Sequence, residues 1–171
     1  MNITQLIARV TNLVLVYLFL FVFSCDAKMK EKDFTPMQRQ EQILRSAVGD
    51  SICRIIKKAR HIEVFCDSIS HKKLCIADRA IVRYIVQDSC NYVSDTEVFG
   101  RFHMYFAVKF THWNRFVICQ YDFRLHKWRI LGKGNKVLKR FDLMNSEILK
   151  YALLSFPRNS ALTEIREEQK K

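Results

Sequence analysis

Residues 102–111 read FHMYFAVKFT, and their alternation decides the fold. One set of alternate positions is apolar: Phe102, Met104, Phe106, Val108 and Phe110. The positions between them are mostly polar or small: His103, Tyr105, Ala107, Lys109 and Thr111. A period of two residues with one apolar face is typical of an antiparallel strand that is buried on one side only. We therefore predict a strand here whose phenylalanine face points into the core.

The segments that follow continue this pattern. Alternation recurs at 115–123, and the segments 128–131 and 136–141 also have strand character. Turn residues separate them, above all Gly132-Lys133-Gly134-Asn135, a sequence typical of a hairpin turn. Four consecutive strands joined by short turns predict an antiparallel meander over residues 101–142.

Patterns on both sides of the meander complete the domain. Apolar spacings of three and four residues predict helices, and a short alternating run predicts one further strand. The helices are placed at 43–60 (with a potential break at 49–51), 77–87 and 145–156, and the strand at 61–67. The predicted fold class is α+β: an antiparallel β-meander of four to five strands with helices packed on one face. Residues 43–157 form the predicted single domain, and 158–171 form a charged C-terminal tail.

An apolar run, Leu13–Cys25 (LVLVYLFLFVFSC), precedes this domain. Only Arg9 is charged before it, and the run falls short of the roughly 20 apolar residues that a membrane-spanning helix needs. A short cationic start followed by such a run is typical of a secretory signal peptide, which we predict at residues 1–24.

The end of the run, Val22-Phe23-Ser24-Cys25, resembles the processing box of bacterial lipoproteins. Phe23 departs from the box, in which a small or aliphatic residue is usual. The resemblance implies cleavage before Cys25 and lipid attachment to its sulfur, where acyl chains hold a protein firmly to a membrane. An uncleaved N-terminal anchor, or ordinary cleavage that leaves Cys25 as a plain thiol, are the alternatives.

Residues 25–42 are predicted to form a lipidated basic tether. Lys28, Lys30 and Lys32 alternate in it, and such side chains favour an anionic leaflet, although they are equally compatible with simple solvation. The predicted location is the exported side of the cell membrane or outer membrane. Which of the two membranes carries the protein stays open.

The chain has a formal net charge of +12, which becomes +11 when Arg9 is removed with the leader. A charge of this size favours polyanions, although it also fits a merely solvated surface. Nucleic acid is not an expected partner of an exported protein, which leaves an envelope protein, an anionic lipid or another polyanion.

The polar face of the meander is the candidate functional surface. It would gather an imidazole, a carboxylate and cations from adjacent strands: His103, Tyr105, Lys109, Gln120, Asp122 and Arg129. A basic hydrolase or ribonuclease-like enzyme could use His103 as general acid or base and a cation to stabilise phosphate charge. A half-exposed sheet also has a polar face without any function, and no signature spacing favours the enzyme.

Cysteine and histidine spacings predict neither a metal site nor a cofactor site. Six cysteines less Cys25 leave an odd number, so at most two disulfides form; their pairing stays open among Cys53, Cys66, Cys75, Cys90 and Cys119. Cys119 could meet His103 or His112 in a hydrolase, but its place in the alternation predicts a buried structural thiol.

Short motifs in the C-terminal half resemble those of small uncharacterised bacterial lipoproteins. The residues that carry this resemblance are Asp88 with Asn91-Tyr92, Lys109-Phe110-Thr111, Tyr121-Asp122-Phe123 with Trp128, Phe141-Asp142 and Phe156-Pro157. The resemblance covers about residues 55–157 and implies no activity. Together with the leader it favours a lipid-anchored, non-enzymatic binding or accessory module of the cell envelope, with the hydrolase as the alternative.

Overall fold

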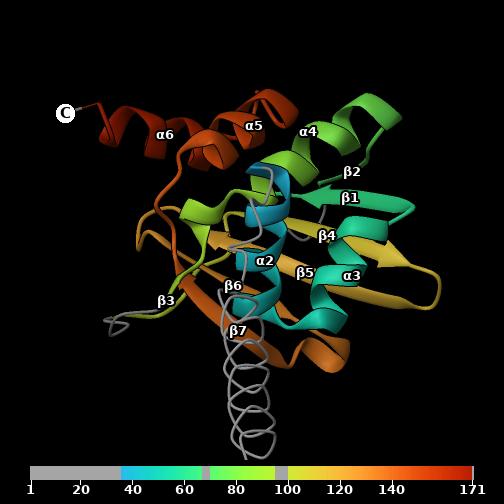
Figure 1. Cartoon of the computed structure of the whole chain (residues 1–171). Coiled ribbons are helices and arrows are strands. Elements are labelled where there is room, and N and C mark those ends of the chain that lie inside the picture. Colours follow the sequence, from blue (N-terminus) through green and yellow to red (C-terminus); the bar gives the residue numbers. More distant parts are fainter. Residues whose placement is uncertain (1–35, 67–69, 95–99, 171) are drawn as a thin grey trace, which may run out of the picture. The chain divides into compact units, whose positions relative to one another are not determined.

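The computed structural model describes residues 36–66, 70–94 and 100–170, which contain five α-helices and one seven-stranded antiparallel sheet (Figure 1). The predicted α+β class is confirmed. The predicted signal peptide, the lipid-attachment residue Cys25 and the tether residues Lys28, Lys30 and Lys32 lie outside the described residues.

The predicted four-strand meander forms the middle of the sheet. Its strands are β4 (Phe106–His112), β5 (Arg115–Asp122), β6 (Lys127–Leu131) and β7 (Val137–Asp142). The remaining strands are β1 (His61–Phe65), β2 (His71–Lys73) and β3 (Val93–Ser94), and the order across the sheet is β2-β1-β4-β5-β6-β7-β3.

The prediction of four to five strands was therefore too low. Strand β1 extends the meander by pairing with β4, as a fifth strand would. Strand β2 is exposed along its whole length, and β3 is only two residues long. Neither carries an apolar alternation, so the pattern that predicts strands could not detect them.

The helices are α2 (Pro36–Val48), α3 (Asp50–Lys58), α4 (Ile76–Gln87), α5 (Glu147–Ser155) and α6 (Ser160–Glu168). The break after the first helix occurs at Gly49, whose φ of 84° is a left-handed conformation that suits glycine. Within the described residues, every helix is too short or too polar to cross a membrane.

Two predicted boundaries were wrong. The first helix begins at Pro36 rather than at residue 43, so the last part of the expected tether is helical. The expected tail 158–171 contains α6, which begins after the capping residue Asn159 and buries Leu162 and Ile165 almost completely. Those two apolar side chains, three residues apart, fix α6 to the domain despite its charged surroundings.

The two faces of the sheet differ as the alternation predicts. The helices pack on one face, called the inner face below, and complete one core with it. The inner-face side chains are Ile62, Val64, Phe106, Val108, Phe110, Val117, Cys119, Tyr121, Trp128, Ile130 and Phe141. The intervening residues of β1 and β4–β7 form the outer face.

Strand β4 begins at Phe106 rather than at Phe102. The segment before it crosses the end of the sheet: Tyr105 still donates its N–H to the carbonyl of Tyr121, but His103 donates its N–H to the carboxylate of Asp122 at 2.7 Å. Phe102 and Met104 consequently contact outer-face residues, Arg129 and Gln120 respectively. The predicted inward placement of Phe102 and Met104 was wrong for this reason.

Candidate anion-binding site on the outer face of the sheet

Strand register places Gln120, Arg129 and Arg140 in one row across the outer face. Gln120 on β5 is opposite Arg129 on β6, and Arg129 is opposite Arg140 on β7. Side chains that are directly opposite in an antiparallel pair lie close together on the same face. Two arginines therefore lie side by side on this face.

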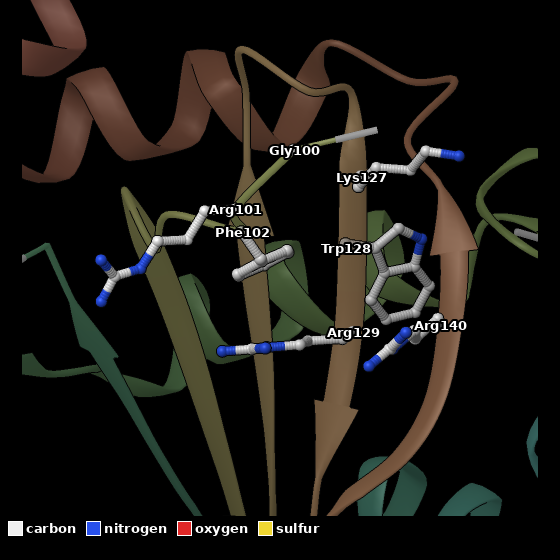
Figure 2. A pocket seen from close by; sticks show the side chains of 7 residues that line it. All are labelled: Gly100, Arg101, Phe102, Lys127, Trp128, Arg129 and Arg140. Carbon is white, nitrogen blue, oxygen red and sulfur yellow. The ribbon is translucent and has the colours of Figure 1, made fainter. Parts of the chain in front are cut away.

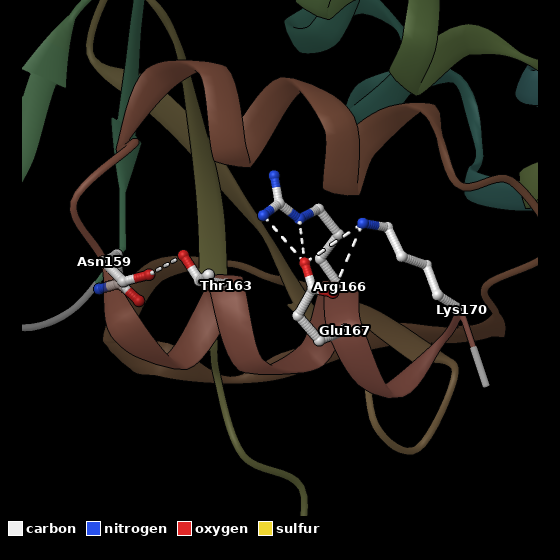
Figure 3. A network of polar contacts seen from close by, with 5 residues as sticks. All are labelled: Asn159, Thr163, Arg166, Glu167 and Lys170. Atoms are coloured by element: carbon white, nitrogen blue, oxygen red, sulfur yellow. Dashed lines mark hydrogen bonds and ion pairs between the residues drawn. The ribbon is translucent and has the colours of Figure 1, made fainter.

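Arg129 is held in place by two neighbours. Its Nε donates a hydrogen bond to Gln120 Oε1 at 2.9 Å, and its guanidinium carbon lies 4.0 Å from the centre of the Phe102 ring. Figure 2 shows its side chain extending from β6 across β5, below Phe102. Its two terminal nitrogens have no acceptor among the residues that the structure describes. The guanidinium is thus fixed while part of its hydrogen-bonding capacity stays unused.

A pocket of about 400 Å³ opens beside Arg129. Its lining residues are Gly100, Arg101, Phe102, Lys127, Trp128, Arg129 and Arg140 (Figure 2). Arg101 and Arg140 are exposed, whereas Arg129 is half-buried. We call this hollow the arginine pocket.

The three arginines of the pocket lack acidic partners among the residues that the structure describes. Within residues 36–66, 70–94 and 100–170, neither Arg101, Arg129 nor Arg140 forms an ion pair. Lys127 differs, because it is paired with Asp142 on β7, and Figure 2 shows its amine pointing away from Arg129. Among the described residues, the pocket therefore gathers three arginines without an ion-pair partner.

Electrostatics at Arg129 agree with this description. Partial burial lowers the pKa of its guanidinium, the neighbouring charge of Arg140 lowers that pKa further, and Asp122 acts in the opposite direction. A guanidinium stays charged in proteins, so the lowered pKa measures the cost of keeping this charge. An anion in the pocket would offset that cost.

The other residues of the predicted surface have structural partners. Lys109 pairs with Glu63 on β1 at 3.3 Å and lies over the ring of Phe116, one row away from Arg129. His103 is exposed, and its ring lies 4.6 Å from that of Tyr105, between ring centres. Of the six predicted surface residues, Arg129 alone lines the arginine pocket, with Gln120 positioning it.

Asp122 is buried, with 1% of its surface exposed. Its carboxylate accepts main-chain N–H groups from His103 at 2.7 Å, Arg124 at 3.1 Å and Leu125 at 3.0 Å. It thereby holds the β5–β6 turn and the approach to β4 together. The hydrolase alternative combined His103, Asp122 and Lys109. Asp122 and Lys109 are engaged in the structural contacts described above, so only the His103 imidazole of these three would be left to act as general acid or base.

Cysteine geometry favours structural roles for the thiols of the core. Cys53, Cys66, Cys75, Cys90 and Cys119 form no disulfide with one another, and Cys119 is fully buried on the inner face. Burial raises the pKa of the Cys119 thiol far above its usual value, which disfavours the reactive thiolate. The predicted burial of Cys119 is confirmed. Among the described residues, no three His, Cys, Asp or Glu side chains gather closely enough to hold a metal ion.

Two of the three arginines of the pocket, Arg101 and Arg140, were not predicted from the sequence. Arg101 lies in the irregular segment that leads into β4, and the position of Arg140 opposite Arg129 depends on the exact register between β6 and β7. Counting outward from the Gly132–Asn135 turn would have paired Arg129 with Leu138 and placed Arg140 two residues further along the same face. The observed register is displaced, with an irregularity between Ile130 and Leu131, and this brings Arg140 opposite Arg129. No sequence signal places Arg101 or Phe102 at the pocket.

Comparison with known proteins finds no family model, no curated protein and no solved structure that matches this chain. The resemblance to small bacterial lipoproteins accordingly stays a prediction, and the geometry described above is what supports a function.

Proposed function

We propose that the folded domain is a non-enzymatic binding module that holds an anionic group, a phosphate or a carboxylate, in the arginine pocket. The observation that carries the proposal is the presence of Arg101, Arg129 and Arg140 around one hollow, without an acidic partner among the described residues. Exposed arginines on a basic protein are common, but Arg129 is half-buried and its terminal nitrogens have no acceptor among the described residues.

The chemistry of the side chains favours this ligand class. A guanidinium presents its N–H groups as a planar fork that matches the oxygens of phosphate and carboxylate. Phe102 and Gln120 fix the plane of Arg129 before any ligand arrives, so little side-chain entropy is lost on binding. The described residues of the pocket lining include no carboxylate or imidazole that could act as a base, which favours binding over catalysis.

Pyrophosphate is a suitable probe, and its binding to the full chain in detergent can be measured by titration calorimetry. We expect Arg140→Gln to weaken binding roughly tenfold to a hundredfold, since a hydrogen bond to a charged group contributes about 1.5–3 kcal/mol. Citrate, titrated in the same way, distinguishes a preference for carboxylates from one for phosphates.

Lys139→Gln is the matched control. Lys139 is the neighbour of Arg140 on β7 and is also exposed, and its substitution removes the same charge. Its register partner, however, is the inner-face residue Ile130. A general effect of net charge would make the two variants bind alike. Equal affinities for the two variants, or the absence of binding to the unaltered chain, would overturn the proposal.

We further propose that the domain is held at a membrane on the exported side by a lipid on Cys25, aided by Lys28, Lys30 and Lys32. The support is the sequence alone: a signal-length apolar run that ends at a cysteine. Cys25→Ala should abolish metabolic labelling with palmitate and release the domain from membranes. Unchanged membrane partition of Cys25→Ala would indicate an uncleaved leader instead.

A further inference from the structure

The β4–β5 turn displays an aromatic side chain in an unusual setting. Trp113 is 70% exposed, and its φ of 55° lies in the left-handed region that bulky residues rarely adopt. The guanidinium carbon of Arg60 lies 4.6 Å from the centre of its ring, and the ring of His112 meets it edge-on. The fold thus holds a large apolar ring in water at the tip of a hairpin, where core packing does not require it.

Two hollows flank the β4–β5 turn, and the residues that line them are the neighbours of Trp113 on this part of the surface. One, of about 440 Å³, lies between the start of α3 and the turn and is lined by Arg54, Trp113 and Arg115, among others. The second, of about 460 Å³, shares Arg115 and extends to the β6–β7 connection with Lys133 and Lys136. The hollows join the turn, the start of α3 and the β6–β7 connection into one surface, called the Trp113 end below.

The Trp113 end is strongly basic. Its cations are Arg54, Arg60, Arg115, Lys133 and Lys136. None of them forms an ion pair within the part of the chain that the structure describes. Asp50 lines the first hollow, but it pairs with Arg45 at 3.0 Å.

Apolar side chains accompany these cations. Besides Trp113, Leu138 is 39% exposed in the second hollow, next to the half-buried Phe116 and Ile52. A tryptophan among lysines and arginines is the composition found at membrane–water interfaces, where the ring enters the headgroup region and the cations meet anionic lipids.

We propose that the Trp113 end docks onto the surface of an anionic lipid bilayer, with the Trp113 ring at headgroup level. Charge complementarity and the exposed ring select this occupant. A nucleic acid would stack its bases on free aromatic faces. Here Arg60 already covers one face of Trp113, and His112 meets the ring edge-on. This docking is independent of the arginine pocket and needs no particular ligand there.

Tryptophan fluorescence reports on this contact directly, because the chain has two tryptophans and Trp128 is only 1% exposed. The probe is a vesicle of phosphatidylserine and phosphatidylcholine with brominated acyl chains, to which the full chain is added. We expect the Trp113 emission to shift to shorter wavelength and to lose most of its intensity by bromine quenching. Trp113→Phe should retain the unquenched emission of the buried Trp128, which also confirms that the variant is folded.

The charge contribution is tested by Arg54→Gln combined with Arg115→Gln, since both residues are exposed and the cation that lies over the ring is Arg60. This double variant should show several-fold less quenching on anionic vesicles. The control with equal charge loss is Arg101→Gln combined with Arg140→Gln, which alters the arginine pocket and should be quenched like the unaltered chain.

Three results would overturn the docking proposal. Trp113 could remain unquenched on anionic vesicles, or be quenched equally on vesicles of phosphatidylcholine alone, which would remove the role of the cations. Quenching by a single-stranded oligonucleotide but not by brominated lipid would assign the surface to nucleic acid instead. Failure of pyrophosphate binding leaves all three readouts unaffected, so the two proposals fail separately.

Discussion

Arg83 on α4 and Arg129 on β6 are two half-buried arginines in closely similar electrostatic settings. Partial burial lowers the pKa of each guanidinium, and a second arginine, Arg79 or Arg140 respectively, lowers it further. Their partners differ. Arg83 donates to the carbonyls of Ile56 at 3.3 Å and Ala59 at 2.8 Å, whereas Arg129 donates to one side-chain oxygen and rests against Phe102.

The difference between the two arginines is the one expected between a structural role for Arg83 and the proposed binding role of Arg129. Ile56 and Ala59 lie at the C-terminal end of α3, where helix carbonyls lack intrahelical partners and a cation is favourable. The burial of Arg83 is therefore explained by the helix end that it caps. The terminal nitrogens of Arg129 face a pocket and have no acceptor among the described residues, and the proposed anionic ligand would supply one.

The largest effect should follow from Arg83→Ala. Loss of two hydrogen bonds from a charged donor should lower the free energy of unfolding by about 1.5–3 kcal/mol, measured by urea denaturation. Pyrophosphate affinity should stay unchanged, because Arg83 lies on the helical side of the domain. If the Arg83→Ala variant were as stable as the unaltered chain, the structural role assigned to Arg83 would be wrong.

Arg129→Gln should reverse this pattern. We expect pyrophosphate affinity to fall about tenfold, which corresponds to roughly 1.4 kcal/mol of binding free energy. The free energy of unfolding should fall by less than about 1 kcal/mol, since the lost contacts are one hydrogen bond and one partly exposed stacking contact. If stability fell as far as in Arg83→Ala while binding persisted, Arg129 would be a structural residue too.

The smallest effect is expected for the stability of Arg140→Gln. Arg140 is exposed, and its positive charge repels that of Arg129. Its removal should therefore raise the free energy of unfolding, by no more than about 0.5 kcal/mol. Urea denaturation at low salt checks this, because added salt screens the repulsion. A clear loss of stability would mean that Arg140 has a packing role.

Alternation was sufficient to predict the inner face of the sheet. Phe106, Val108 and Phe110 are buried as their spacing indicates, and Cys119 lies among them as a structural thiol. An alternation of period two predicts the buried face because successive side chains of a strand point to opposite faces of the sheet, and the apolar set faces the core. The helices α4 and α5 follow from their own periodicity in the same way, and their observed ends lie within two residues of the predicted ones.

The outer face could be predicted only as a set of residues, because its pairings depend on long-range geometry. Lys109 is neutralised by Glu63, which comes from a strand far away in the sequence and becomes its neighbour only when β1 pairs with β4. Asp122 was expected to be a surface carboxylate, but main-chain N–H groups of a turn and of His103 surround it. No local sequence pattern shows which charges lack an ion-pair partner after folding. The arginine pocket is defined by such charges among the described residues.

One proton–nitrogen correlation spectrum of the arginine Nε–H groups tests the central claim most directly. Arg83 and Arg129 should both give signals in this spectrum, because each Nε–H donates a hydrogen bond. Arg83 donates to the carbonyl of Ile56, and Arg129 donates to Gln120 Oε1. On titration of the full chain with pyrophosphate, the Arg129 signal should move and saturate while the Arg83 signal stays in place. A stationary Arg129 signal, or equal movement of both signals, would contradict the assignment of the pocket as an anion site.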